Sequence, residues 1–188
     1  MAELLEVRLH GRGGLGAVTS AELLAQAAAG EGKFTQSFPS FGPERRGAPV
    51  VAFLRVSDEF IRTRTNVRTP DYSVVIDPRL LSVVDVTEGL KDNGVIIINS
   101  SRSPKQLKAD YGYKWPVASV NATHIAQETI GLPITNTAMI GAFLKVAPII
   151  PLEAMKEALQ ERFGSRASQN FTAMQRAYDE LLFEGAAI

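Results

Sequence analysis

The stretch Leu5–Gly16, LEVRLHGRGGLG, decides the fold, because it joins an alternating apolar run to a glycine loop. Apolar residues at 5, 7 and 9 have polar residues between them, a period of two that predicts a β-strand with one buried face. In the alanine-rich run that follows, Val18, Ala21, Leu24 and Ala28 recur at helical steps. The stretch therefore predicts a strand, a tight turn and a helix.

A glycine loop at the start of a helix favours an anion as its ligand. Its backbone N–H groups can approach a ligand closely, and the helix adds its positive end. The glycine spacing also fits a dinucleotide motif, but the strand expected at 33–38 has no acidic residue to hold a ribose. A loop that merely allows close packing is the open alternative. The candidate binding residues of the loop are Gly11, Arg12, Gly13, Gly14, Leu15 and Gly16.

Composition limits both the class of protein and its chemistry. A chain of 188 residues with 45% hydrophobic content predicts a single domain over 1–188. Twenty basic and twenty acidic residues cancel, so we expect neither a nucleic-acid nor a membrane partner. Cysteine is absent, which excludes disulfides, thiolate nucleophiles and cysteine-ligated iron–sulfur clusters. Without a signal segment or a spanning apolar run, a cytoplasmic location is expected.

The rest of the chain alternates between strand and helix patterns, which predicts a three-layer α/β/α fold. Two runs, Val50–Val56 and Phe60–Thr65, predict a hairpin, so the sheet is expected to be mostly parallel but mixed. Further strands are predicted at 72–76, 95–98 and 115–120. Helices are predicted at 80–90, 104–111, after 121–123, 136–147, 152–163 and 168–183.

A second loop, at 38–49, combines Pro and Gly residues with three adjacent charges, Glu44, Arg45 and Arg46. Arginine suits phosphate or carboxylate because its planar fork donates two parallel hydrogen bonds. The alternative is a solvated loop with an internal ion pair of little energetic value. We therefore expect this loop to contact a partner chain or a ligand.

The titratable residues do not suggest catalysis by this chain. The two histidines, His10 and His124, cannot build a multi-histidine metal site, and no Ser–His–acid order is evident. We interpret His10 as a strand-end histidine bonded to backbone, and Asp77 as a turn residue. Neither a catalytic residue nor a metal ligand is predicted.

Three segments together resemble the gamma subunit of the 2-oxoacid:ferredoxin oxidoreductases, most closely the pyruvate enzymes. They are HGRGGLG at 10–16, FPSFGPERRGAP at 38–49 and NTAMIGA at 136–142, and the likeness covers nearly the whole chain. Leu15 and Glu22 depart from the pattern, since the family often has glutamine at the first position and its single-chain relatives carry lysine at the second. The resemblance adds Asn136 to the candidate binding residues.

The resemblance implies a non-catalytic subunit of an enzyme that converts a 2-oxoacid, expected to be pyruvate, to acyl-coenzyme A and reduces ferredoxin. Thiamine diphosphate, magnesium and iron–sulfur clusters are then expected on partner subunits of the alpha, beta and delta types. The glycine loop is expected at the active-site entrance, where it can contact coenzyme A. The alternative is a stand-alone nucleotide- or anion-binding α/β module.

Overall fold

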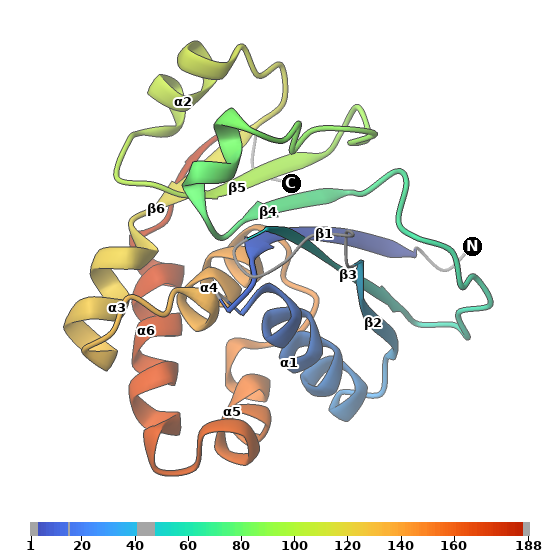
Figure 1. Cartoon of the computed structure of the whole chain (residues 1–188). Helices are drawn as coiled ribbons and strands as arrows, with labels where there is room; N and C mark the ends of the chain where they lie inside the picture. The colour runs from blue at the N-terminus through green and yellow to red at the C-terminus, as the bar shows by residue number, and fades with distance from the viewer. Residues whose placement is uncertain (1–3, 15, 41–47, 186–188) are drawn as a thin grey trace.

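In the computed structural model, which describes residues 4–14, 16–40 and 48–185, one mixed sheet separates two unequal layers (Figure 1). Its strands lie in the order β2-β3-β1-β4-β5-β6-β7. Their bounds are β1 Leu5–Arg12, β2 Phe34–Ser40, β3 Pro49–Ser57, β4 Tyr72–Val75, β5 Val95–Asn99, β6 Val117–Val120 and β7 Leu182–Glu184.

The direction of the strands changes across the sheet. Strands β1, β4, β5 and β6 run parallel, whereas β3 lies antiparallel between β1 and β2, and β7 is antiparallel to β6. In the described residues three pairings are thus parallel and three antiparallel. The sheet is mixed, as the sequence predicts.

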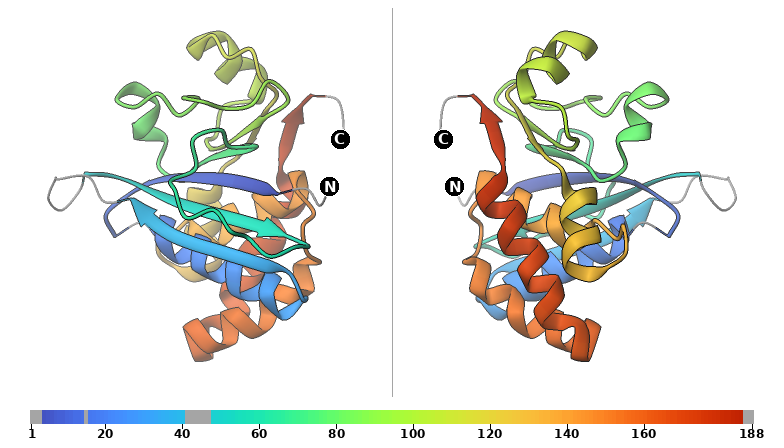
Figure 2. Two further views of the ribbon diagram at one scale, coloured as in Figure 1. Left: turned by 90° about the vertical axis from the view of Figure 1, so that its right-hand side faces the viewer. Right: turned by 90° about the vertical axis from the view of Figure 1, so that its left-hand side faces the viewer.

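The helices divide unequally between the two faces (Figures 1 and 2). Five of them cover one face: α1 Ala17–Gly30, α3 Ala122–Ile130, α4 Asn136–Val146, α5 Met155–Phe163 and α6 Ala167–Glu180. The other face carries α2 Pro104–Tyr111, the 3-10 helix η1 Pro78–Ser82 and irregular chain. Two further 3-10 turns, η2 Leu152–Ala154 and η3 Gly164–Arg166, flank α5. This arrangement is the predicted α/β fold with helices on both faces.

Each face of the sheet has its own apolar core. Val7, Leu9 and Ile97 belong to a large cluster beneath the five helices, and Val75 and Ile98 belong to a smaller one under α2 and η1. Strands buried on both sides are typical of a parallel sheet between helices. The thinner layer leaves room at the sheet surface for the polar side chains of β1.

Local signals set several helix ends as predicted. Ser103 caps α2 through a reciprocal bond with Gln106, and Gly112 ends the helix in the left-handed conformation. Asn121 caps α3 by accepting the N–H of His124. These caps satisfy backbone donors that a helix start leaves unpaired.

Four predictions about the strands and helices were wrong. Residues 60–65 form no strand, because both edges of β3 are taken, by β1 and β2, so β2 and β3 make the hairpin. Residues 80–90 contain only the end of η1 and turns. The last helix ends at Glu180, and β7 follows it. Finally, β1 is buried on both faces, since Arg8 and His10 are enclosed too.

Candidate functional site

The carboxyl ends of β1, β4, β5 and β6 meet at one edge of the sheet, here named the carboxyl edge. After β1 the chain passes through α1 toward β2, whereas after β4 it turns through η1 toward β5, on the other side. The two connections therefore diverge between β1 and β4. Such a switch point is where open α/β sheets bind ligands.

The glycines of the loop have different functions in the structure. A Cβ on Gly11 would lie 2.8 Å from the Ala17 Cβ, and one on Gly16 would lie 2.9 Å from the Asn136 Cβ, so both positions require close packing. Gly14 adopts φ +91°, and no atom of the described residues lies within 4 Å of a Cβ position there, so the backbone of Gly14 is not covered by those residues. Gly13 donates its N–H to the Ala48 carbonyl at 3.3 Å. Leu15 lies outside the described residues.

Asn136, at the start of α4, lies directly against the loop. Its side chain meets Gly16, and the Ser20 hydroxyl bonds both the Gly16 carbonyl, at 3.0 Å, and the Asn136 carbonyl, at 3.4 Å. Only 3% of Asn136 is exposed, and its Oδ1 accepts no hydrogen bond from the described part of the chain. The structure thus brings together the glycine loop and Asn136, which are more than a hundred residues apart.

Asp77, at the end of β4, is held by two arginines. Arg79 grips it through Nε and Nη2, with Nη2 2.8 Å from Oδ2, while the Arg12 Nε lies 3.2 Å from the same oxygen. Burial alone would raise the pKa of Asp77, but the hydrogen bonds from Arg79 and the charges of both arginines lower it. The carboxylate stays ionised, and two cations against one anion leave the carboxyl edge with an excess positive charge.

The sequence predicted only part of this Arg12–Asp77–Arg79 cluster. Arg12 is a candidate binding residue because it lies inside the glycine loop. Asp77 was interpreted as a turn residue, and no function was predicted for Arg79. The side chain of Asp77 does cap η1 by accepting the Arg79 N–H at 3.0 Å, so the turn interpretation describes part of its role. The Asp77-Pro78-Arg79 order after a buried strand was the available signal.

Asn99 joins the neighbouring strand ends at the same edge. Its Nδ2 donates to the Ile76 carbonyl and to the Thr123 hydroxyl, both at 3.0 Å, and its Oδ1 accepts the Thr123 N–H at 3.3 Å. The side chain therefore ties the end of β4 to the start of α3 across β5. Sequence reasoning missed this residue, because an Asn at a strand end is also common in turns.

His10 is buried beside the loop, and its interpretation as a histidine bonded to backbone was wrong. It is 3% exposed, and neither ring nitrogen has a hydrogen-bond partner among the described residues. Burial, together with the nearby positive charge of Arg8, lowers the pKa of His10 to about 3, although Asp85 acts in the opposite sense. The imidazole is therefore neutral at physiological pH.

Other candidates do not add to the site. Glu44, Arg45 and Arg46 lie outside the described residues. Within the described ranges, no group of three or more His, Asp or Glu side chains could hold a metal ion. No helix in those ranges has the length and apolar character needed to cross a bilayer. The site at the carboxyl edge thus consists of backbone donors, the Arg12–Asp77–Arg79 cluster and amide side chains.

Taken together, these features define an α/β domain that presents a positively charged, glycine-lined edge at the switch point of its sheet. A family model described as pyruvate ferredoxin/flavodoxin oxidoreductase matches residues 6–180. The chain belongs to this family and is a gamma subunit of a 2-oxoacid:ferredoxin oxidoreductase.

Individual relatives agree along almost the full length. The chain is 49% identical over 179 residues to the pyruvate/ketoisovalerate oxidoreductases common subunit gamma of Thermococcus kodakarensis, covering 94% of this chain and 97% of that protein. It is 47% identical to pyruvate synthase subunit PorC of Methanocaldococcus jannaschii, covering 95% and 98%. The crystal structure of pyruvate oxidoreductase subunit PORC from Thermotoga maritima superposes with a TM-score of 0.86 at 34% identity, covering 97% and 99%. The resemblance on which the sequence analysis relied is confirmed.

Proposed function

We propose that this chain forms the wall of the active-site entrance that receives coenzyme A, in a complex that converts pyruvate or a related 2-oxoacid to acyl-coenzyme A and reduces ferredoxin. The observation that carries the proposal is the Arg12–Asp77–Arg79 cluster beside the open backbone of Gly14. In this role the chain positions a substrate, and other subunits perform the redox chemistry.

A phosphate group of coenzyme A fits the charge and geometry of the carboxyl edge. Arg79 is mostly exposed and Arg12 partly so, and each has guanidinium N–H groups besides those that face Asp77. The start of α1 adds the positive end of a fourteen-residue helix. The Gly13 N–H is engaged by Ala48, so the donors that support the proposal are at Gly14 and on the two arginines.

The donor set of this chain does not fit the redox cofactors. Iron–sulfur clusters need thiolates, and the chain has no cysteine. The described residues also offer no carboxylate cluster for the magnesium that accompanies thiamine diphosphate. We therefore assign thiamine diphosphate, magnesium and the clusters to partner subunits of the alpha, beta and delta types, and place the complex in the cytoplasm.

The test replaces Gly14 with valine in the reconstituted complex. A side chain there would fill the space proposed for the phosphate, so the Michaelis constant for coenzyme A should rise at least tenfold, as expected when one charge-assisted hydrogen bond of roughly 1.5–3 kcal/mol is lost. The Michaelis constant for the 2-oxoacid should change little. Steady-state kinetics with each substrate varied in turn measures both.

The matched control is Gly32→Val, at the other end of α1. Gly32 has φ +82°, close to the +91° of Gly14, and also has no atom within 4 Å of a Cβ position. The two substitutions therefore impose similar backbone strain, and only one blocks the proposed site. Equal coenzyme A constants in the two variants, with normal assembly, would refute the proposal and leave the loop as a packing element.

A further inference from the structure

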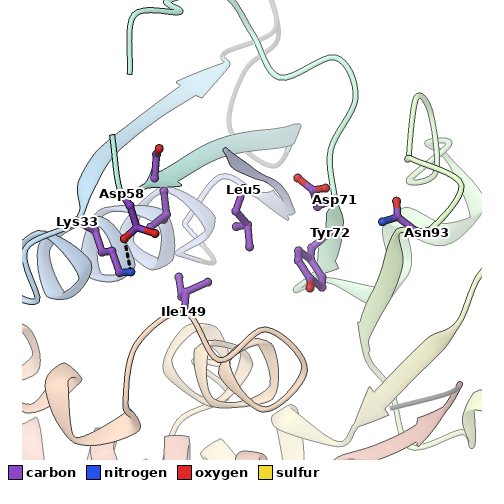
Figure 3. Close-up of a pocket in the computed structure, with 9 residues that line it drawn as sticks. Leu5, Lys33, Asp58, Asp71, Tyr72, Asn93 and Ile149 are labelled. Carbon is purple, nitrogen blue, oxygen red and sulfur yellow. Dashed lines mark hydrogen bonds and ion pairs between the residues drawn. The ribbon is translucent and has the colours of Figure 1, made fainter. Parts of the chain in front are cut away.

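A cavity of about 330 Å³ lies where the amino ends of β1 and β4 meet, here named the amino edge of the sheet (Figure 3). The glycine loop is at the opposite, carboxyl edge. Leu5 and Ile149 form an apolar middle, with Lys33 and Asp58 at one end and Asp71 at the other. Leu5 begins β1, Lys33 and Asp71 directly precede β2 and β4, Asp58 directly follows β3, and Ile149 lies between α4 and η2. The cavity therefore belongs to a different edge from the proposed coenzyme A site.

The two carboxylates of the cavity differ in how they are engaged. Asp71 is mostly buried, and both oxygens are used: Oδ1 faces Lys91 at 2.7 Å and Oδ2 accepts the Glu6 N–H at 2.9 Å. Asp58 has a side chain that is 70% exposed, and among the described residues only its Oδ1 is engaged, by Lys33 at 2.5 Å. Asp58 can therefore accept a further cationic donor without losing its present partner.

An exposed aromatic pair lies at the same end of the sheet, outside the lining of the cavity. Phe34 follows Lys33 directly, and Phe60 lies two residues after Asp58. The two rings meet edge to face with centroids 5.9 Å apart, and the residues are 45% and 69% exposed. Two large apolar side chains placed together at the surface are typical of an interface, because each would gain by leaving water.

We propose that the surface made by Phe34, Phe60 and this cavity, the amino-edge surface, is a docking site for another subunit of the same oxidoreductase, which inserts an arginine side chain into it. The alkyl part of an arginine matches the apolar middle at Leu5 and Ile149, and its guanidinium matches the open side of Asp58.

Membership in the family indicates that the partner docked on this surface is another subunit of the oxidoreductase. A gamma subunit must bury part of its surface against other subunits, and arginine and aromatic residues are enriched in the centres of such interfaces. Contact at the amino edge leaves the carboxyl edge open, so one chain can hold a neighbour and face the active site at once. The inference rests on the subunit identity alone and does not depend on coenzyme A binding.

The test compares Phe60→Ala and Asp58→Asn with Leu182→Ala. Leu182 is 56% exposed on β7, so the control removes a similarly exposed apolar side chain far from the amino edge. Each variant chain is titrated into the remaining purified subunits and its affinity is measured by calorimetry. We expect both amino-edge variants to bind at least about tenfold more weakly than wild type, and the control to bind with wild-type affinity. The melting temperatures of the isolated chains should not change.

Charge gives a second readout. If Asp58 meets a guanidinium, added salt should weaken wild-type binding more than it weakens binding of Asp58→Asn. Wild-type affinity in both amino-edge variants would overturn the proposal. If Phe60→Ala binds weakly but the affinity of Asp58→Asn depends on salt as that of wild type does, the docking surface stands and the inserted arginine is refuted. Gly14→Val in the same titration should bind normally, which separates this test from that of the coenzyme A site.

Discussion

At the scale of single residues, Arg8 shows how a charged side chain is accommodated inside this sheet. Its guanidinium donates to the Glu88 carbonyl at 2.6 Å and to the Val67 carbonyl at 2.7 Å. Burial lowers the pKa of Arg8, partly offset by the charges of Glu88 and Asp85. The side chain thus fastens two irregular segments to the thinly covered face of the sheet. One of them includes Asp85, whose charge also acts on His10.

The low pKa of buried His10 predicts that the folded protein loses stability in mild acid. Its folded pKa, about 3, lies below the ordinary 6.5, so below pH 6.5 the unfolded chain binds a proton that the folded chain does not. Stability from this residue is complete above pH 6.5 and falls by up to about 1.4 kcal/mol for each pH unit down toward 3. Urea unfolding at pH 7.5 and pH 5 should show a loss about 2 kcal/mol larger in wild type than in His10→Phe.

Phenylalanine is a suitable replacement because it keeps a flat ring and breaks no hydrogen bond of the described structure. Its effect on stability at pH 7.5 does not enter the comparison, which uses only the difference between the two pH values. The same acid sensitivity in both proteins would mean that His10 is protonated in the folded state.

The polar side chains of β1 also show where sequence reasoning stopped at this scale. Alternation correctly placed Val7 and Leu9 toward the large core, but it assigned Arg8 and His10 to solvent. Their cover comes from chain near residues 67–68 and 85–88, far along the sequence. No local pattern in β1 reports such a cover, because it depends on tertiary folding.

At the scale of elements, the crossing of α4 and α6 depends on one glycine. A Cβ on Gly141 would lie 1.9 Å from the Met174 carbonyl oxygen, so the two helices touch backbone to backbone. Gly141→Ala must push α6 away, and we expect it to cost about 3 kcal/mol or to prevent folding. Thermal and chemical unfolding of the purified variant measure this cost.

Gly131→Ala is the control for this substitution. Gly131 ends α3 with φ +79° and has no atom within 4 Å of a Cβ position, so alanine there meets strain without a clash. Its expected cost is about 1 kcal/mol. Equal losses in the two variants would show that the helices can move apart freely, contrary to the close packing described.

The elements that were mispredicted share a physical cause, which is competition between local and distant partners. Residues 60–65 have a strand-like composition, but β2 and β1 occupy both edges of β3. Within 80–90, Asp85 accepts the N–H and the hydroxyl of Thr87, which favours a turn over a helix. Strand β7 has only three residues, too few for a recognisable pattern, and it exists because β6 offers an edge.

At the scale of the whole molecule, the chain should be inactive by itself. Purified alone, we expect it to be colourless, to bind no thiamine diphosphate and to reduce no acceptor dye with a 2-oxoacid, since it has no cysteine and the proposed redox centres lie on other subunits. Activity should appear when those subunits are added. Absorption spectra, calorimetry and a dye assay measure these properties, and turnover by the isolated chain would contradict the proposed division of roles.

Much of the candidate site could be anticipated at this scale, though for unequal reasons. The glycine loop followed from spacing, and Asn136 followed from resemblance, and the structure places the two in contact. The Arg12–Asp77–Arg79 cluster could not be derived, because the meeting of the ends of β1 and β4 depends on strand order. Strand order is a property of the entire sheet, which a single sequence pattern does not encode.

The late position of α6 and β7 in the chain has a consequence for biosynthesis. Helix α6 packs on α3, α4 and α5, and β7 covers the free edge of β6, yet both leave the ribosome after the elements that they contact. Until then the face of α4 and the edge of β6 stay open, and α4 carries the Asn136 that supports the glycine loop. We expect the nascent chain to need protection from aggregation until α6 and β7 have emerged, and the subunit to become competent for assembly only after they have docked.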